Sequence, residues 1–252
     1  MLTNLLLLIA LALLAISIYQ VRLMKRVNEK LIKLVSPERD IRRIAKAQSD
    51  ASWQHYRQSE FYSQLIRLLD LSAPIPSTRS WAASPDVLLT LLEHAQNSKP
   101  ARILDLGSGM STLVLAKSAP SAQIFSIDNS EEWAGKTAQL LQSHAVTNVD
   151  LRVAPLTPHS SGVDWYELSK FGDISNIDLL FIDGPPGSKN PKARHPVILE
   201  CAAKLNPRAV VVIDDAGRDG EKDLALEFAK VLPNHTLEFL PHEKGTAVLL
   251  PR

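Results

Sequence analysis

The chain has 252 residues, and its 28 basic and 27 acidic residues leave a formal net charge of +1 at pH 7. This length suits one sizeable α/β domain with an appendage. The balanced charge argues against a broad basic surface for nucleic acid. The single cysteine, Cys201, excludes an internal disulfide framework and a four-cysteine zinc site.

The chain opens with a largely apolar run from Met1 to Leu23, and Arg22, Lys25 and Arg26 follow its core. A bilayer span needs roughly 20 apolar residues, and basic residues mark the cytoplasmic side of a span. We therefore predict an uncleaved, single-pass transmembrane anchor over residues 1–23, with the rest of the chain in the cytoplasm. A cleaved signal peptide is the alternative, but a basic n-region and an Ala-x-Ala site are missing.

Residues 24–72 repeat apolar side chains at roughly helical intervals, among them Leu31, Ile41, Trp53 and Phe61. This pattern predicts a helical stalk or cap, which is also a candidate seam for a homodimer. Two heptads are too few to claim a coiled coil. Proline residues after position 73 end the helical pattern, so we place the start of the main domain there, over 73–252.

The main domain alternates between extended and helical patterns. Apolar runs predict strands near 103–106, 123–128, 149–153, 177–183 and 209–213, and an antiparallel pair at 235–240 and 246–250. Helical patterns lie between them, and residues 157–172 read as a polar insertion that carries aromatic residues. The alternation predicts an α/β, doubly wound sheet, whose ligands bind beyond the carboxyl ends of the strands.

The most informative stretch runs from Ile103 to Thr112 and reads as a buried strand, a glycine turn and a helix start. Gly107 and Gly109 permit positive φ and a close approach of the backbone to a ligand. Exposed amides at such a turn suit a polar or anionic group. An NAD fingerprint would need a third glycine at position 112, which is threonine here, so an NAD-dependent enzyme is disfavoured.

Acidic residues stand at the ends of three other predicted strands. They are Asp128, Asp183, Asp214 and Asp215. Because the carboxyl ends of parallel strands meet at one edge of a sheet, we expect these carboxylates at the ligand crevice. Asp128 follows the glycine turn by about 20 residues, where a doubly wound fold places an acid on a ribose.

These segments together resemble a class I S-adenosylmethionine-dependent methyltransferase. The resemblance rests on Asp105-Leu-Gly-Ser-Gly109, Ile127-Asp128, Leu180-Phe-Ile-Asp183-Gly-Pro-Pro-Gly187 and Val212-Ile-Asp214-Asp215. The last two, with Arg194-His195-Pro196 and Arg218, are similar to a bacterial subgroup of methyltransferase-domain proteins. The resemblance covers about residues 81–250 and implies a Rossmann-like sheet of seven strands, of which the last is antiparallel.

The resemblance also implies which residues hold the cofactor, S-adenosylmethionine. The methionine part would lie along Asp105, Gly107, Ser108 and Gly109. Asp128 would take both ribose hydroxyls, because two carboxylate oxygens match a vicinal diol. Ala154-Pro155 would border the adenine, and Ser84 and Trp81 would close over the cofactor.

Catalytic and metal-binding roles are implied for a second set of residues. Some O-methyltransferases hold three oxygen ligands at the positions of Asp183, Asp214 and Asp215. Mg²⁺ or another divalent cation there would lower the pKa of an acceptor hydroxyl. The alternative is that these acids only bind loop amides and cap a turn. His195 is a candidate general base, and Asp183 is the second catalytic candidate.

We therefore expect O-methylation of a small-molecule, saccharide or lipid-linked acceptor at the cytoplasmic membrane face. Lys189, Lys192 and Arg194 make the loop after the Gly-Pro-Pro-Gly turn basic and favour an anionic acceptor. The competing hypothesis is a non-catalytic, membrane-anchored partner protein that keeps the methyltransferase fold. Retention of the glycine turn and of Asp128 speaks against it, since a degenerate fold does not need them.

Overall fold

The protein is described from a computed structural model that covers residues 2–78 and 82–252, with the side chains of 2–8 and 34–39 left out. The chain divides into two compact units, Met1–His55 and Tyr56–Arg252. Trp81, which was expected to close over the cofactor, lies outside the described residues. The expected boundaries at 23/24 and 72/73 stay predictions.

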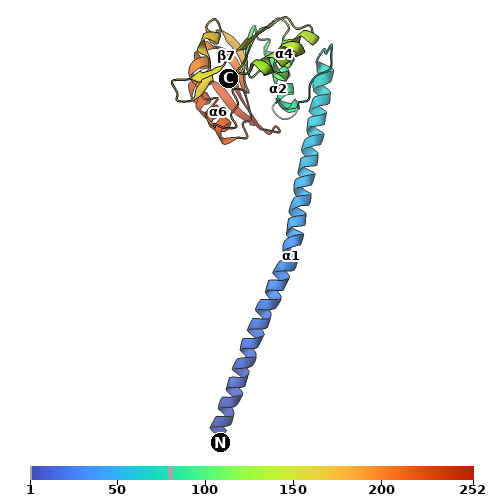
Figure 1. Ribbon diagram of the computed structural model, residues 1–252, viewed down its shortest axis with the longest axis vertical. Helices are drawn as coiled ribbons and strands as arrows, with labels where there is room; N and C mark the ends of the chain where they lie inside the picture. The colour runs from blue at the N-terminus through green and yellow to red at the C-terminus, as the bar shows by residue number, and fades with distance from the viewer. Residues whose placement is uncertain (1, 79–81) are drawn as a thin grey trace. The chain divides into compact units, whose positions relative to one another are not determined.

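The N-terminal region is a helix, α1 (Leu2–Leu68) (Figure 1). In the part of the chain with described side chains, none of the helices is both long enough and apolar enough to span a bilayer. The predicted transmembrane anchor at 1–23 is therefore wrong, as is the cytoplasmic membrane location inferred from it. The physical reason is that the polar and charged residues Gln20, Arg22 and Lys25 interrupt the apolar stretch after Tyr19. The side chains of this stretch are described from Ile9 onward.

The second unit is built on one seven-stranded sheet with the order β3-β2-β1-β6-β7-β9-β8. The strands are β1 (Arg102–Leu106), β2 (Gln123–Asp128), β3 (Val149–Val153), β6 (Ile177–Ile182), β7 (Leu205–Asp214), β8 (His235–Leu240) and β9 (Thr246–Pro251). Strand β9 pairs antiparallel with β7 and β8, whereas the pairs from β3 to β7 are parallel. The predicted Rossmann-like sheet is confirmed.

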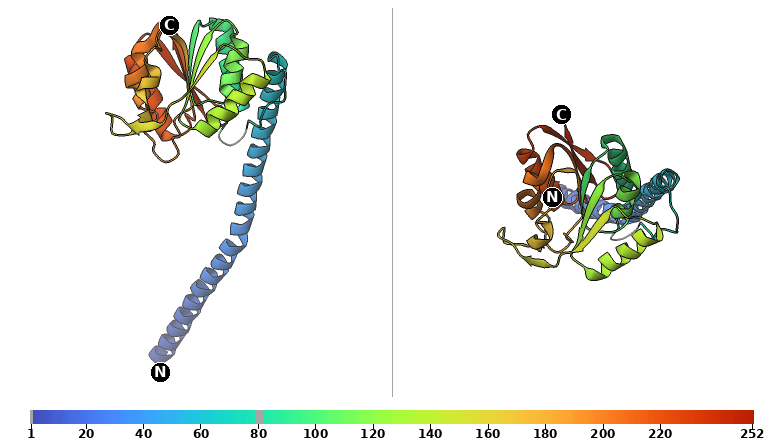
Figure 2. Two further views of the ribbon diagram at one scale, coloured as in Figure 1. Left: turned by 45° about the horizontal axis from the view of Figure 1, so that its top comes forward. Right: turned by 90° about the horizontal axis from the view of Figure 1, so that it is seen from above.

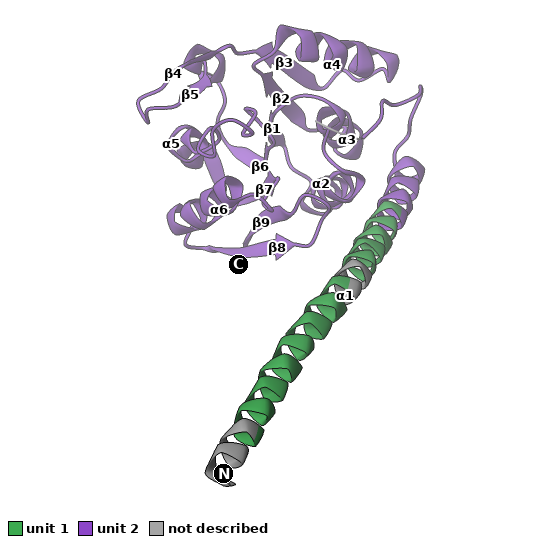
Figure 3. Ribbon diagram, turned by 60° about the horizontal axis from the view of Figure 1, so that its bottom comes forward, with its two compact units in different colours: residues 1–55 green, residues 56–252 purple. Residues whose placement is uncertain are grey.

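Helices cover both faces of this sheet (Figure 2). One face carries α2 (Pro85–Ser98), α3 (Met110–Ser118) and α4 (Glu131–Ser143), and the other carries α5 (Pro196–Cys201) and α6 (Asp219–Val231) (Figure 3). Short 3₁₀ helices lie at Leu168–Phe171 and Ala202–Lys204. The predicted polar insertion instead contains a hairpin, β4 (Leu156–Pro158) and β5 (Asp164–Tyr166), whose residues Trp165 and Tyr166 are buried.

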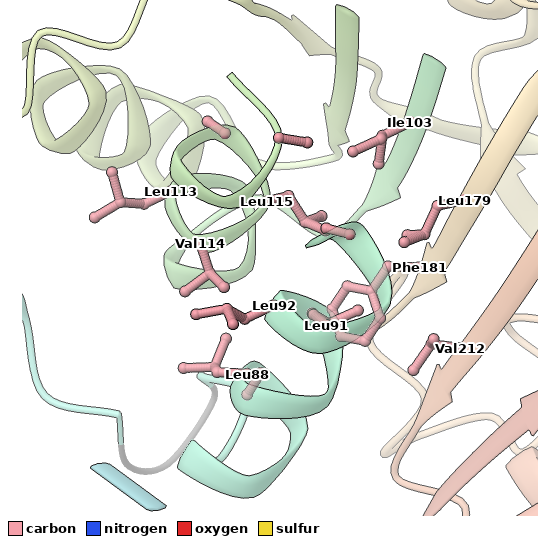
Figure 4. Close-up of a cluster of buried hydrophobic side chains, with 14 of the residues drawn as sticks. Leu88, Leu91, Leu92, Ile103, Leu113, Val114, Leu115, Leu179, Phe181 and Val212 are labelled. Atoms are coloured by element: carbon pink, nitrogen blue, oxygen red, sulfur yellow. The ribbon is translucent and has the colours of Figure 1, made fainter. Parts of the chain in front are cut away.

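Alternation along the strands divides the core into two hydrophobic clusters. Ile103 of β1 faces the cluster under α2 and α3, while the next residue, Leu104, faces the cluster under α5 and α6. Figure 4 shows the first cluster, to which α2 contributes Leu91 and β6 contributes Phe181. Cys201 is fully buried in the second cluster, as expected of a small core residue.

Asp86 connects three segments of the second unit at the start of α2. Its Oδ1 accepts hydrogen bonds from Ser84 Oγ at 2.5 Å and Val87 N at 2.9 Å. Its Oδ2 accepts from Gln58 Nε2 at 2.7 Å and from Glu243 N at 2.8 Å. Burial alone would raise the pKa of Asp86, but these hydrogen bonds lower it. Asp86 therefore stays charged and ties the end of α1 to the β8–β9 turn.

Candidate active site at the switch point of the sheet

The chain builds β1, β2 and β3 outward and then returns to place β6 on the other side of β1. Such a switch point creates the ligand crevice of doubly wound folds. Gly107 follows β1 with φ +102°, and Gly184 follows β6. A Cβ on Gly107 would lie 3.1 Å from the Asp183 carbonyl carbon, and one on Gly184 would lie 3.2 Å from Gly107 Cα. Both positions need glycine because the two backbones pack directly together.

Asp105 lies beneath the glycine turn and is fully buried. Its Oδ2 accepts hydrogen bonds from Thr112 Oγ1 at 2.6 Å and Ser126 Oγ at 3.1 Å, and its Oδ1 accepts one from Ser111 Oγ at 3.2 Å. Burial raises the pKa of Asp105 to about 7 although these hydroxyls oppose the shift. The geometry makes Asp105 a brace between the turn, α3 and β2.

Ser108 and Asp128, both predicted cofactor residues, are brought into direct contact. Asp128 Oδ2 accepts hydrogen bonds from Ser108 N at 3.0 Å and Ser108 Oγ at 2.7 Å. Its Oδ1 accepts one from Ser130 N at 2.8 Å. Ser108 Oγ also lies 3.0 Å from Thr137 Oγ1 on α4. The end of β2 is thereby fixed against the turn after β1, with Gly107 and Gly109 on either side of Ser108.

The three predicted metal ligands also meet, but they meet around a guanidinium group. Arg194 Nη2 donates to Asp183 O at 2.6 Å, to Asp183 Oδ1 at 3.2 Å and to Asp215 Oδ2 at 3.0 Å. Its Nη1 donates to Asp214 O at 3.2 Å. Across the described ranges, no group of three or more His, Cys, Asp or Glu side chains is arranged to hold a metal ion. The donor set therefore does not fit the expected cation.

The electrostatics of this cluster are dominated by burial. Burial and the nearby Asp214 carboxylate raise the pKa of Asp183 well above its usual value, although Arg194 opposes this. Burial and Asp215 raise the pKa of Asp214 to about 6. Asp215 adopts φ +61°, a conformation that aspartate tolerates better than most residues. Burial thus makes the charged form of the Asp183 carboxyl group less favourable than that of an ordinary aspartate.

The remaining predicted residues lie elsewhere. His195 Nε2 is 3.7 Å from Glu227 Oε2 on α6, and no hydrogen bond or ion pair joins His195 to Asp183 in the described part of the chain. The Ser84 hydroxyl donates to Asp86 and is 1% exposed. The roles that the resemblance implied, a general base for His195 and a cofactor contact for Ser84, stay predictions.

Sequence reasoning missed Tyr166 on β5. Its hydroxyl is buried without a hydrogen-bond partner among the described residues and fills the space that a Cβ on Gly184 would take. Burial and then the Asp128 carboxylate raise its pKa, so the phenol is neutral. The sequence signal was only an aromatic residue within a polar insertion. In the sequence, Arg194 was noted for its charge and as part of the Arg194-His195-Pro196 segment. Its contacts were not predicted, because its buried partners Asp183 and Asp215 follow two different strands.

Comparison with known proteins finds a family model that matches the part of the chain that forms this site. Residues 104–216 match a family model described as a methyltransferase domain. This range contains the glycine turn, Asp128, Tyr166 and the cluster around Arg194. No curated protein matches the chain significantly.

Solved structures share the fold at low sequence identity. The O-methyltransferase TomG from Streptomyces achromogenes, involved in tomaymycin synthesis and solved with S-adenosylmethionine, is 19% identical at a TM-score of 0.54, covering 79% of this chain and 96% of its own. The Bacillus cereus O-methyltransferase, solved with S-adenosylhomocysteine, is 16% identical at a TM-score of 0.54, with coverages of 80% and 97%. The Podospora anserina methyltransferase PaMTH1, also S-adenosylhomocysteine-bound, is 16% identical at a TM-score of 0.52, with coverages of 77% and 87%.

The family match and the shared fold agree with the residues at the switch point. The seven strands, the antiparallel β9 and the glycine turn after β1 are those that the sequence resemblance implied. That resemblance is confirmed: residues 104–216 match a methyltransferase-domain model, and the sheet shares the fold of solved O-methyltransferases.

Proposed function

We propose that this domain transfers the methyl group of S-adenosylmethionine to a hydroxyl oxygen of a small molecule. The observation that carries the proposal is the contact between Ser108 and Asp128 beside Gly107, at the switch point of the sheet. A carboxylate fixed there offers two oxygens to a ribose diol. The O-methyltransferase folds of the Streptomyces and Bacillus proteins support an oxygen acceptor.

The transfer itself asks little covalent chemistry of the protein. The sulfonium already activates the methyl group, so aligning the acceptor oxygen, methyl carbon and sulfur supplies much of the rate. The oxygen–carbon bond forms as the carbon–sulfur bond breaks, which leaves S-adenosylhomocysteine. The hydroxyl proton passes to the Asp183 carboxylate at the end of β6, which burial makes a stronger base than an ordinary aspartate by raising its pKa. We assign this role to Asp183 in preference to His195.

Titration calorimetry with S-adenosylmethionine tests the cofactor site. We expect Asp128→Ala to weaken binding by about tenfold or more, because a charged hydrogen-bond acceptor contributes roughly 1.5–3 kcal/mol. Asp150→Ala is the matched control, since Asp150 lies on the neighbouring strand β3 with a side chain that is 41% exposed. If folded wild-type protein fails to bind the cofactor, the proposal is wrong and the non-catalytic partner hypothesis takes its place.

Asp183→Asn tests the general base separately from the cofactor site. The amide keeps the shape of the carboxyl group but cannot take up a proton, so we expect turnover to fall by roughly 10²-fold or more. Cofactor affinity should stay within about threefold of wild type, because less than 1 kcal/mol of binding is at stake. Equal losses in turnover and affinity would contradict the assigned role.

A further inference from the structure

We propose that the guanidinium of Arg194 takes the place of a divalent cation at the carboxyl ends of β6 and β7, so that this protein holds Asp183 in position without a metal. The metal-free positioning of Asp183 matters for catalysis only if the proposed methyl transfer is correct. The exclusion of a cation by Arg194 is a property of the folded chain and can be measured on its own.

The hydrogen bonds of Arg194 occupy one carboxylate oxygen of Asp183 and one of Asp215. One nitrogen, Nη2, lies 3.2 Å from Asp183 Oδ1 and 3.0 Å from Asp215 Oδ2, while Nε donates to Pro185 O at 3.1 Å. Mg²⁺ requires its oxygen ligands at about 2.0–2.1 Å with near-octahedral geometry. A cation bound between the two carboxylates would therefore overlap Nη2, so guanidinium and metal exclude each other.

The position of Arg194 is fixed by burial as well as by charge. Its side chain is 4% exposed, and its Nε also lies 3.7 Å from Glu221 Oε1 on α6. Burial alone would lower the pKa of Arg194, but Asp183, Asp215 and Glu221 raise it. The guanidinium is therefore a permanent cation at this position, and its planar fork matches the carboxylate and carbonyl oxygens around it.

Arg218 supports the same arrangement from the solvent side. Its Nη1 lies 2.9 Å from Asp215 Oδ2 and 3.8 Å from Glu221 Oε1, while its own side chain is 46% exposed. Two buried oxygens, Asp214 Oδ2 and Asp215 Oδ1, have no hydrogen-bond partner among the described residues. Loss of Arg194 would also take the donor from Asp183 Oδ1. Unpaired carboxylate oxygens are the ligands that hard divalent cations prefer.

The first experiment titrates chelator-treated wild-type protein with Mn²⁺ and follows binding by calorimetry. We expect no Mn²⁺ binding by wild type that depends on the Asp215 carboxylate. A parallel Mn²⁺ titration of Asp215→Asn checks this dependence. Saturable Mn²⁺ binding by wild type that disappears in Asp215→Asn would overturn the proposal. Titration of the same wild-type sample with S-adenosylmethionine separates the two proposals, because failure to bind the cofactor contradicts the proposed function and leaves the Mn²⁺ result standing.

The second experiment removes the guanidinium. We expect Arg194→Ala to bind Mn²⁺ at least about tenfold more tightly than wild type, because the freed carboxylates can now surround a cation. Arg194→Lys, which keeps a positive charge near the same oxygens, should not gain this affinity. Folded Arg194→Ala protein that gains no Mn²⁺ affinity would also overturn the proposal.

Arg152→Ala is the matched control for the loss of an arginine. Arg152 bridges Asp150 at 2.6 Å and Asp173 at 2.6 Å, and its side chain is 18% exposed. The partner carboxylates are 41% and 65% exposed, so water solvates them once the arginine is gone. We expect no gain in Mn²⁺ affinity. If Arg194→Ala does not fold, the wild-type titration decides the proposal by itself.

Discussion

At the residue scale, burial beneath the glycine turn disfavours the charged form of Asp105. Its pKa is raised from 3.8 to about 7 by burial. The folded protein therefore keeps a proton that the unfolded chain has released, and the contribution of Asp105 to stability falls as the pH rises between these values. The contribution is fully present below pH 3.8 and lost above about pH 7.

Asp105→Asn tests this linkage, because the amide resembles the protonated acid and does not titrate. We expect the free energy of unfolding of wild type, measured relative to Asp105→Asn, to fall between pH 3.8 and about 7 and then to level off. Urea unfolding of both proteins across this range provides the measurement. A constant difference between the two proteins would mean that Asp105 keeps its ordinary pKa.

Some residues of the site could be predicted from the sequence and others could not. Asp128 and Ser108 could be predicted because a strand end and a glycine turn each have a local pattern. Arg194 could not, since its partners Asp183 and Asp215 come from β6 and β7 and meet it only in the folded sheet. The metal expectation has the same limit: three acids at strand ends indicate oxygen ligands, but the sequence does not say whether a metal ion or a guanidinium neutralises them.

At the scale of elements, the turn after β1 depends on one glycine. Gly107 has φ +102°, and an added Cβ would lie 3.1 Å from both Asp183 C and Gly184 N. We expect Gly107→Ala to destabilise the protein by roughly 1–3 kcal/mol, since alanine is strained at this φ and meets backbone that has no freedom to move. Cofactor affinity should fall as well, because Ser108 is the next residue of the turn.

Gly135→Ala is the internal control for this prediction. Gly135 lies within α4, and a Cβ there meets nothing within 4 Å. Alanine in a helix interior is favoured over glycine by about 0.5–1 kcal/mol, so this variant should be more stable than wild type. Urea unfolding of both variants is the measurement. Equal effects of the two substitutions would show that the Gly107 turn relaxes without cost.

The strands also show which elements can be predicted from residue patterns and which cannot. Five parallel strands, four from apolar runs and the one at 149–153 from alternation, and the closing antiparallel pair were predicted from their patterns, and they are confirmed. The β4–β5 hairpin was missed because each strand has three residues, too few for alternation to register. Its buried Trp165 and Tyr166 fill the second core cluster, a role that only the folded sheet reveals.

At the scale of the whole molecule, the two core clusters draw only on residues from Phe61 onward within the described chain. The apolar residues before His55 whose side chains are described (9–33 and 40–54) belong to the first unit and are exposed there, among them Leu13 at 59% and Met24 at 75%. The same apolar pattern therefore goes with buried side chains near the end of α1 and with exposed side chains in its first part. Sequence alone does not separate these parts, because both repeat at helical intervals.

Two truncated chains test this division. A chain of residues 56–252 keeps both clusters and the hydrogen bond from Gln58 to Asp86, so its melting temperature should equal that of the full chain. A chain of residues 71–252 loses Leu65 and Leu69, which are 0% and 6% exposed. Removal of one buried leucine side chain costs about 2–5 kcal/mol, so we expect severe destabilisation or failure to fold.

Leu65→Ala in the full chain locates the effect. We expect a loss of about 2–5 kcal/mol in the free energy of unfolding, because the substitution opens a cavity under α2 in the first cluster. Ile44→Ala is the control, since Ile44 lies on the same helix at 61% exposure and should change stability by less than about 0.5 kcal/mol. Equal melting temperatures for 56–252 and 71–252 would mean that the end of α1 adds nothing to the core, whatever its burial.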